Sequence, residues 1–464
     1  MGIYGAINAA ISGLKAQSYA LENISGNIAN SQTTGYKRLD TSFSDLVASG
    51  GNDQTTQKAG TVNANSRATN EIPGDIQRSD IDTHMAIKGD GYFVVQEKLG
   101  QTDGRSIFSG NNVYTRRGDF TIDEEGYLVN GAGYYLFGNP IDETTGNVSG
   151  TVPELIQITN DFMGARQTTQ IEYRGNLPTY PITAQSDSTT PGSELLDSSI
   201  TPGTDITAND NTAFLRSSLA GEAITVYDEN GSPVNVQFRW AKSQNADSSV
   251  PQNAQWELYY MADPTATGTD AMWTHAGQFE FDGSGALVST TDDTGTTSTP
   301  AGSSMTLSDV TVAGNNIGDL QFAFGSDGLT QYADPNGSAK VKTLAQDGYA
   351  SGEQTGVQIS GSGRIVATYN NGQTRDLYEI PIASFSADSR LERLPGGAFA
   401  QTTDSGEPLY SATGSVKGNS LEASNTDIAD EFSRLIITQQ AYSANTRIVT
   451  SGDEMLQEAL NMVR

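Results

Sequence analysis

Apolar residues recur at every seventh position along the last stretch of the chain, 425–464. The row consists of Ile428, Leu435, Tyr442, Val449, Leu456 and Val463, and it is widened into a stripe by Phe432, Ile436 and Leu460. A seven-residue spacing keeps one face of an α-helix turned toward a second helix. The pattern therefore predicts an amphipathic helix of about 35 residues, with Asn425 or Thr426 as its N-cap.

The first residues of the chain carry a matching row. Ile7, Leu14, Leu21 and Ile28 also repeat at seven, and Ile3, Ile11 and Ile24 lie beside them. We expect 1–35 and 425–464 to form a terminal helical domain in which the two stripes cover each other as a coiled coil. Two ordinary helices of an α+β domain are the alternative, although typical globular helices run only about 8 to 20 residues. The predicted assembly contacts are Ile7, Leu14, Leu21, Ile28, Ile428, Leu435, Tyr442, Val449 and Leu456.

Between the helices, short apolar runs alternate with turns rich in Gly, Asn and Asp, which is typical of β-hairpins. We expect an extended connector over 36–75, a discontinuous β domain from 76–150 and 346–424, and an outer β domain inserted at 151–345, in one part or two. Polar runs at 183–213 and 289–304 are expected to be loops that carry little core. The predicted fold is thus mainly β with long α-helical termini, in nested domains.

Composition narrows the possible partners. The 464 residues carry a net charge of −29, which argues against binding to nucleic acid or to anionic membranes. The absence of cysteine excludes disulfides and thiolate metal sites. We also expect no secretory signal, because Met1–Ala10 lacks a basic region, and no membrane insertion, because no apolar run reaches transmembrane length.

Candidate catalytic groups are few. His84 and His275 are the only histidines and stand in unlike contexts. The acidic clusters Asp123-Glu124-Glu125 and Asp292-Asp293 lack EF-hand spacing and lie beside glycine, as in ordinary β-turns. Gly89-Asp90-Gly91 is not followed by the Lys-Ser/Thr of a phosphate loop. We therefore predict no catalytic, cofactor-binding or metal-binding residues, and a chain that is not an enzyme.

Several motifs, in the same order as here, resemble those of the bacterial flagellar rod and hook proteins. The N-terminal one is Gly26–Lys37, in which we single out Ala29, Asn30, Thr34, Gly35, Tyr36 and Lys37. It continues into Phe43-Ser44-Asp45-Leu46. The others are Ala86–Phe93, Tyr114–Phe120, Gln439–Asn445 and Asp453–Leu456. Gly26 and Gly452 depart from the family pattern, and a kink near Gly452 is conceivable because glycine weakens helices.

The resemblance is strongest to the hook members of that family, because rod members are much shorter and lack a large β insertion. It implies an extracellular subunit that polymerises with itself into the curved tube between rod and filament and transmits torque. It also implies export by the flagellar type III apparatus, without a cleaved signal, and contacts with the distal rod protein, the hook cap and the hook–filament junction protein. A distal rod protein of the same family and an extracellular β-rich adhesin are the alternatives.

Overall fold

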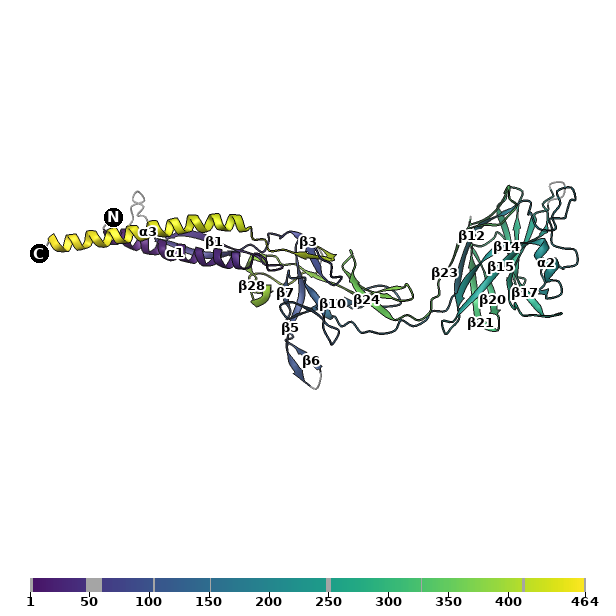
Figure 1. The fold of residues 1–464 in the computed structure, drawn as a ribbon, viewed down its shortest axis with the longest axis horizontal. Coiled ribbons are helices and arrows are strands. Elements are labelled where there is room, and N and C mark those ends of the chain that lie inside the picture. Colours follow the sequence, from purple (N-terminus) through teal and green to yellow (C-terminus); the bar gives the residue numbers. More distant parts are fainter. Residues whose placement is uncertain are drawn as a thin grey trace. The chain divides into compact units, whose positions relative to one another are not determined.

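A computed structural model of the chain describes residues 3–46, 61–102, 105–150, 152–247, 252–326, 328–410 and 414–462. The chain divides into two compact units (Figure 1). The first unit contains both ends of the chain, Met1–Asn160 and Gln354–Arg464, and the second is the continuous segment Asp161–Glu353. Each unit has its own hydrophobic core, and the two are described separately below.

Two long antiparallel helices form one end of the first unit. Helix α1 spans Ile3–Ala29 and helix α3 spans Ile428–Met462, and they lie side by side with the two chain termini at the same end of the pair (Figure 1). The long terminal helices predicted from the seven-residue rows are confirmed. Helix α3 continues through Gly452 as one helix, so this glycine does not end it.

The N-cap of α3 differs from the prediction. The Asp427 carboxylate accepts the backbone N–H of Ala429 at 2.8 Å and that of Asp430 at 3.3 Å, as an N-cap side chain does. Asn425 is occupied elsewhere, because its Oδ1 accepts the backbone N–H of Arg38 at 2.7 Å. The expectation of Asn425 or Thr426 as the cap was therefore wrong by one or two positions.

A two-stranded sheet lies against α1. Strands β1 (Leu39–Leu46) and β2 (Thr61–Ala68) fall within the segment predicted as an extended connector, and they pair antiparallel. The Tyr19 hydroxyl bonds to the Ser66 hydroxyl at 2.7 Å, and Asn23 Nδ2 donates to Thr41 Oγ1 at 2.9 Å. Helix α1 thus has two neighbours, α3 and this hairpin.

The centre of the first unit is a 13-stranded sheet built from both halves of the chain. Along its main path the order is β24 (Gln354–Ile359), β25 (Arg364–Tyr369), β26 (Thr374–Glu379), β10 (Tyr134–Pro140), β5 (Tyr92–Thr102), β7 (Val113–Thr115), β29 (Ala398–Ala400) and β28 (Glu392–Arg393). Beside this path lie β6 (Arg105–Phe108), β8 (Phe120–Ile122), β9 (Leu128–Asn130), β11 (Glu154–Leu155) and β27 (Ile382–Ala383). Two 3₁₀ turns, Asp388–Arg390 and Pro395–Gly397, flank β28. The core of the 13-stranded sheet includes the fully buried residues Phe93, Phe120, Leu136 and Ile365.

Two short pairings join the beginning of this sheet region to the segment that leads into α3. Strand β3 (Ile76–Arg78) pairs with β31 (Ser420–Glu422), and β4 (Met85–Lys88) pairs with β30 (Ser415–Gly418). Both pairs are antiparallel. The chain therefore returns to its starting point just before the last helix begins.

The second unit packs two sheets around one aromatic core. One sheet contains β20 (Ser304–Val312), β21 (Asn315–Ala323), β12 (Gln170–Pro178), β22 (Leu329–Tyr332) and β23 (Lys340–Gln346). The other contains β13 (Ile206–Thr207), β14 (Ser218–Tyr227), β15 (Pro233–Gln244), β16 (Ala254–Met261), β17 (Ala271–Phe281), β18 (Leu287–Asp292) and β19 (Thr297–Ser298), with helix α2 (Asn211–Ser217) beside it. Trp240, Trp256 and Phe279 from the second sheet meet Tyr173 and Phe322 from the first.

The polar run 183–213 is more than a surface loop. Three of its apolar residues, Leu196, Ile200 and Ile206, are buried together with Phe214 and Trp273 in a second cluster of this unit. In the other run, 289–304, Ser289 and Thr290 are buried within β18. The expectation of little core was wrong for 183–213, because its low average hydrophobicity hides three apolar residues that are buried.

Candidate assembly site at the chain ends

The buried positions of α1 are mainly small residues. Ala10, Gly13, Ala16 and Ala20 are buried, followed by Ile24 and Asn27 toward the end of the helix. The predicted contacts Ile7, Leu14, Leu21 and Ile28 are half-buried, and Ile7 lies directly against Gly452 of α3. Small residues allow two helix backbones to approach closely.

On α3 no residue of the predicted apolar row that the structure describes is fully buried. Leu435, Val449 and Leu456 are half-buried, whereas Ile428 and Tyr442 remain exposed. Val463 lies outside the described residues. The buried positions Glu431, Thr438 and Gly452, with half-buried Asn445 between them, form a second row with the same seven-residue spacing. Reasoning from apolar residues missed this row because its members are polar or lack a side chain.

Several large apolar residues of α3 touch neither α1 nor the β1–β2 hairpin enough to be covered. They are Phe432, Ile436, Ile437, Ile448, Met455, Leu460 and Met462, all at least 49% exposed. Isolated exposed apolar residues are ordinary on a protein surface, but a helix that exposes so many is typical of an interaction surface. At about 3.6 residues per turn, Ile437, Ile448, Met455 and Met462 lie on one side of the helix and the others around it. We refer to all seven residues together as the outer face of α3.

At the other end of the helices, a buried ion cluster holds the two chain ends together. Lys37 Nζ donates to Glu422 Oε1 at 2.5 Å and to the carbonyl of Ile72 at 2.8 Å. The other carboxylate oxygen lies 3.3 Å from Arg116 Nη1, and the Gly74 N–H donates to Oε1 at 2.8 Å. Burial lowers the pKa of Lys37, and the facing Glu422 carboxylate partly offsets this effect. We call this group, Lys37, Ile72, Gly74, Arg116 and Glu422, the clasp.

Gly35 is required by the backbone beside the clasp. Its φ is +67°, and a β-carbon there would lie 2.8 Å from both the carbonyl carbon of Arg116 and the backbone nitrogen of Arg117. Its N–H donates to the Glu422 carbonyl at 2.7 Å. Only glycine combines this conformation with so close an approach. Gly35 and Lys37 of the predicted motif are thus brought together on Glu422.

The other motif residues divide between supporting and peripheral positions. The Tyr36 ring lies 5.2 Å from the Arg393 guanidinium, and its carbonyl accepts the Asn425 N–H at 3.2 Å. Asn30 ends α1, because its Nδ2 donates to the Gly26 carbonyl at 2.9 Å. Ala29 is exposed and Thr34 is half-buried. These two residues do not take part in the clasp described above.

Four charged residues next to the clasp were not predicted as site residues. Arg38 lies 3.6 Å from the buried carboxylate of Glu431 and 3.7 Å from Asp40, and Arg434 Nη1 lies 2.7 Å from Asp40. Arg38 and Asp40 are close in sequence, but Glu431 and Arg434 reach them from the other end of the chain. The one usable signal was the consecutive pair Lys37-Arg38 in a chain with few basic residues.

The histidines and acidic clusters show no catalytic arrangement. His84 Nδ1 bonds to the Ser79 hydroxyl at 2.8 Å, and burial lowers the pKa of His84. His275 Nε2 lies 2.8 Å from the buried Glu257 carboxylate, in the other unit. The Asp123 and Asp292 carboxylates accept backbone N–H groups of their own turns. Among the described residues, no group of three or more His, Cys, Asp or Glu side chains is placed to hold a metal ion.

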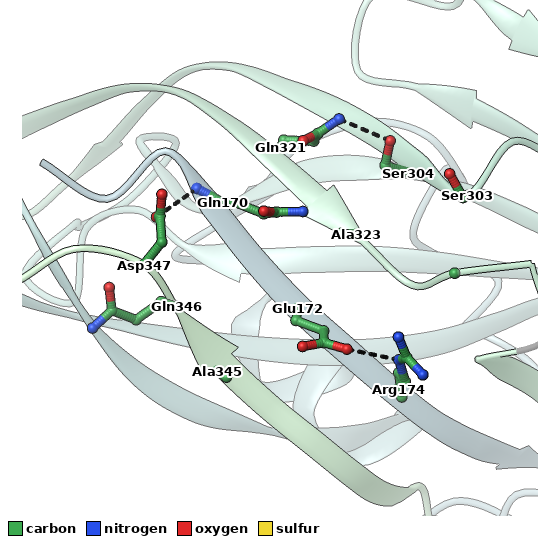
Figure 2. Close-up of a pocket in the computed structure, with 11 residues that line it drawn as sticks. Gln170, Glu172, Arg174, Ser303, Ser304, Gln321, Ala323, Ala345, Gln346 and Asp347 are labelled. Carbon is green, nitrogen blue, oxygen red and sulfur yellow. Dashed lines mark hydrogen bonds and ion pairs between the residues drawn. The ribbon is translucent and has the colours of Figure 1, made fainter. Parts of the chain in front are cut away.

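The second unit contains an open polar depression of about 470 Å³, shown in Figure 2. Its polar groups are bonded to one another. Glu172 and Arg174 on β12 form an ion pair at 2.8 Å, and Gln321 Nε2 donates to Ser304 Oγ at 3.0 Å. The Asp347 carboxylate accepts the backbone N–H groups of Thr169 and Gln170. This depression therefore presents no activated nucleophile or base, and the terminal helices and the clasp remain the candidate functional site.

None of the helices that the structure describes is long and apolar enough to cross a membrane.

Models of four protein families match successive parts of the chain. They are described as flagella basal body rod protein (residues 7–37), flagellar hook protein FlgE/F/G D1 domain (86–177), flagellar basal body protein FlaE D2 domain (195–349) and flagellar basal body rod FlgEFG protein C-terminal (417–462). The two terminal matches coincide with α1 and its motif and with β30 to α3.

The relatives that align with essentially the whole chain are described as flagellar hook proteins. The chain is 29% identical to a flagellar hook protein of Brucella suis and 28% identical to one of Caulobacter vibrioides, each alignment covering all of both chains. It is 26% identical to the flagellar hook protein of Salmonella typhimurium over 98% of each chain. Among solved structures, a Helicobacter pylori flagellar hook protein matches 75% of this chain and all of its own, with a TM-score of 0.49 and 16% identity.

Proposed function

This chain belongs to the family of flagellar hook and rod proteins, and from that premise we propose that copies of it polymerise into the flagellar hook through their terminal helices. The hook is the extracellular tube that joins the rod to the filament and transmits motor torque. The relatives from Brucella, Caulobacter and Salmonella are hook proteins over essentially the whole chain, which favours a hook subunit over a distal rod protein or an adhesin.

The observation that carries the assembly proposal is the outer face of α3. Helix α1 and the β1–β2 hairpin leave this apolar surface in water, at 65% exposure for Ile437 and 54% for Met455. Burying apolar surface stabilises by about 25 cal/mol per Å². A neighbouring subunit that covered this face would therefore gain at every contact along a polymer. The seven-residue rows suit helix-to-helix packing for such contacts.

Further partners follow from the family and remain part of the proposal. A hook tube must begin on the distal rod protein, grow beneath a hook cap and end at a hook–filament junction protein. Its subunits must leave the cell through the flagellar type III export apparatus, for which no cleaved signal is needed. No cofactor enters this account, and the family is a structural one.

The experiment is polymerisation of the purified chain, observed by sedimentation and electron microscopy. The full chain should form tubes, and a chain that ends before Ile428 should form none while keeping the β-sheet signal in circular dichroism. The second unit and the 13-stranded sheet have cores that do not include α3, so they should still fold. Tubes formed by the truncated chain would contradict the proposal.

A further inference from the structure

The two terminal helices approach each other closely at two glycines, one on each helix. A β-carbon on Gly13 would lie 2.8 Å from Asn445 Nδ2 and 3.2 Å from its Cγ. A β-carbon on Gly452 would lie 2.8 Å from Ile7 Cγ1 and 3.2 Å from its Cδ1. At distances this short, an added methyl group would force the Asn445 or the Ile7 side chain to shift. Each glycine thus forms a hole that one side chain of the opposite helix fills.

Glycine is among the poorest residues in a helix interior, so its presence at these two positions requires a structural explanation. Gly5 and Gly26 on α1 provide a comparison, since no heavy atom of the described residues lies within 4 Å of a β-carbon placed on either of them. Gly13 and Gly452 are buried, whereas Gly5 is exposed and Gly26 is half-buried. Close packing therefore accounts for Gly13 and Gly452 and does not account for the other two.

We propose that Gly13 and Gly452 lock the axial register of the α1–α3 pair, with Asn445 and Ile7 as the side chains that enter the two holes. The inference rests on the proposed function, because it concerns how the assembly surface is positioned. A shift of one heptad along the antiparallel pair would set Asn445 against Ala20 and Gly452 against Leu14. The first shifted contact would meet a β-carbon, whereas the second would place Leu14 at Gly452 in place of Ile7. Asn445 therefore fits its hole only in the observed register, and the Gly452 hole receives Ile7 only there.

The register matters because it fixes what the next subunit meets. Arg434 pairs with Asp40 on β1, and Arg38 pairs with Glu431, so the start of α3 is already tied to the clasp end. The two glycine contacts lie further along the helices and fix the remainder of α3. The outer-face residues Ile448 and Met455 lie on this distal part. A helix pair that slipped or splayed would present them at different heights in different copies.

The test is a set of glycine-to-alanine substitutions in the full chain. Gly13→Ala and Gly452→Ala should each raise the critical concentration for tube formation at least about tenfold, because overpacking a close contact is destabilising. Gly5→Ala and Gly26→Ala are the matched controls. They should leave that concentration unchanged or lower it, because alanine favours the helix and meets no neighbour.

Removing the facing side chain should restore assembly if the contact itself is responsible. Gly13→Ala with Asn445→Ala, and Gly452→Ala with Ile7→Ala, should assemble better than Gly13→Ala and Gly452→Ala alone. Such coupling separates a packing contact from a simple change in helix propensity. Equal behaviour of Gly13→Ala and Gly5→Ala would overturn the lock, and so would the absence of any compensation in the double variants.

A second readout keeps the lock distinct from the proposed function. Amide exchange across Ala10–Ala20 in unassembled protein should be faster in Gly13→Ala than in Gly5→Ala. A wild-type chain that forms no tubes but shows this difference would refute the proposed function and support the lock. Exchange without any protection in α1, together with an absence of tubes, would overturn both.

Discussion

Glu422 joins the two ends of the chain within the clasp. Its buried carboxylate accepts from Lys37, lies beside Arg116 and accepts the Gly74 N–H. Taking charges out of water is costly, and a buried ion pair repays that cost only when its partners are all in place. The clasp therefore constrains the position of α3. Removing one of its charged partners should destabilise the first unit, because a charge would remain buried without its partner.

Glu422→Gln should lower the free energy of unfolding of the first unit by about 3–5 kcal/mol, because Lys37 would be left buried without its counter-charge. Urea denaturation followed by circular dichroism measures this. The control is Glu172→Gln in the half-exposed pair with Arg174, for which we expect a change within about 1 kcal/mol. A loss for Glu422→Gln no greater than the control's would show that the clasp contributes little.

Turn aspartates predict how stability depends on pH. Asp142 and Asp228 each accept backbone N–H groups within their own turns, chiefly those of Thr145 and Ser232, and these bonds hold the pKa of each carboxyl below its ordinary value. A carboxyl whose pKa is lower folded than unfolded stabilises the fold above the unfolded pKa, about 3.9. That contribution is lost as the pH falls through the folded pKa.

Stability should therefore change little from these groups between about pH 7 and pH 5, and should decline below about pH 4. Carboxyl titration followed by NMR, with urea denaturation at each pH, measures both halves of the prediction. Asp228→Asn should remove part of the acid-dependent loss. A carboxyl of Asp228 that titrated at or above the ordinary pKa would contradict the assignment.

At the scale of elements, the apolar rows predicted the two long helices because helix periodicity is local and is repeated many times along each segment. Ile7 of the predicted row meets Gly452, whereas Gly13, Asn445 and Gly452 themselves lie off the apolar rows. Close approach of two helices requires small residues, and hydrophobicity gives little weight to Ala10, Gly13 or Thr438. The clasp was beyond sequence reasoning for another reason, since Lys37 and Glu422 are 385 positions apart. Only Gly35 and Lys37 were singled out in advance, through the family motif.

The run 183–213 yields a prediction at the same scale. Ile206→Ala should lower the free energy of unfolding of the second unit by about 2–5 kcal/mol, because the lost side chain leaves a cavity beside Phe214 and Trp273. Ile182→Ala, immediately before this run, is the control, since Ile182 is 55% exposed. Its substitution should cost less than about 1 kcal/mol. Denaturation curves that coincide for the two variants would mean that Ile206 carries no core.

Leu456 tests the contact between the two helices. It is half-buried on the row that flanks α1, so Leu456→Asp would bring an unpaired charge into that contact and should prevent tube formation. The β-sheet signal of the monomer should persist, because both sheet cores exclude α3. Gln439→Ala, at an exposed position of the same helix, should assemble normally. Loss of the β-sheet signal in Leu456→Asp would instead place α3 within a globular core.

At the scale of the whole molecule, the chain begins and ends in the same unit, and the other unit is inserted between Asn160 and Gln354. The first unit therefore contains the clasp, the helix pair and the outer face of α3 together. The net charge of −29 keeps isolated copies apart at low salt, so association must come from short-range apolar contact. The nested order of segments was readable from the sequence, whereas the unit boundaries depend on contacts that only the fold reveals.

The most direct test of assembly through the outer face of α3 is electron microscopy of the Met455→Asp variant, with Met455→Leu as the matched control. Met455 is 54% exposed in the single chain, so the aspartate should leave the monomer's circular dichroism and unfolding unchanged. If neighbouring subunits cover this face, Met455→Asp should form no tubes while Met455→Leu forms them normally. Tubes of normal length and number from Met455→Asp would contradict the account.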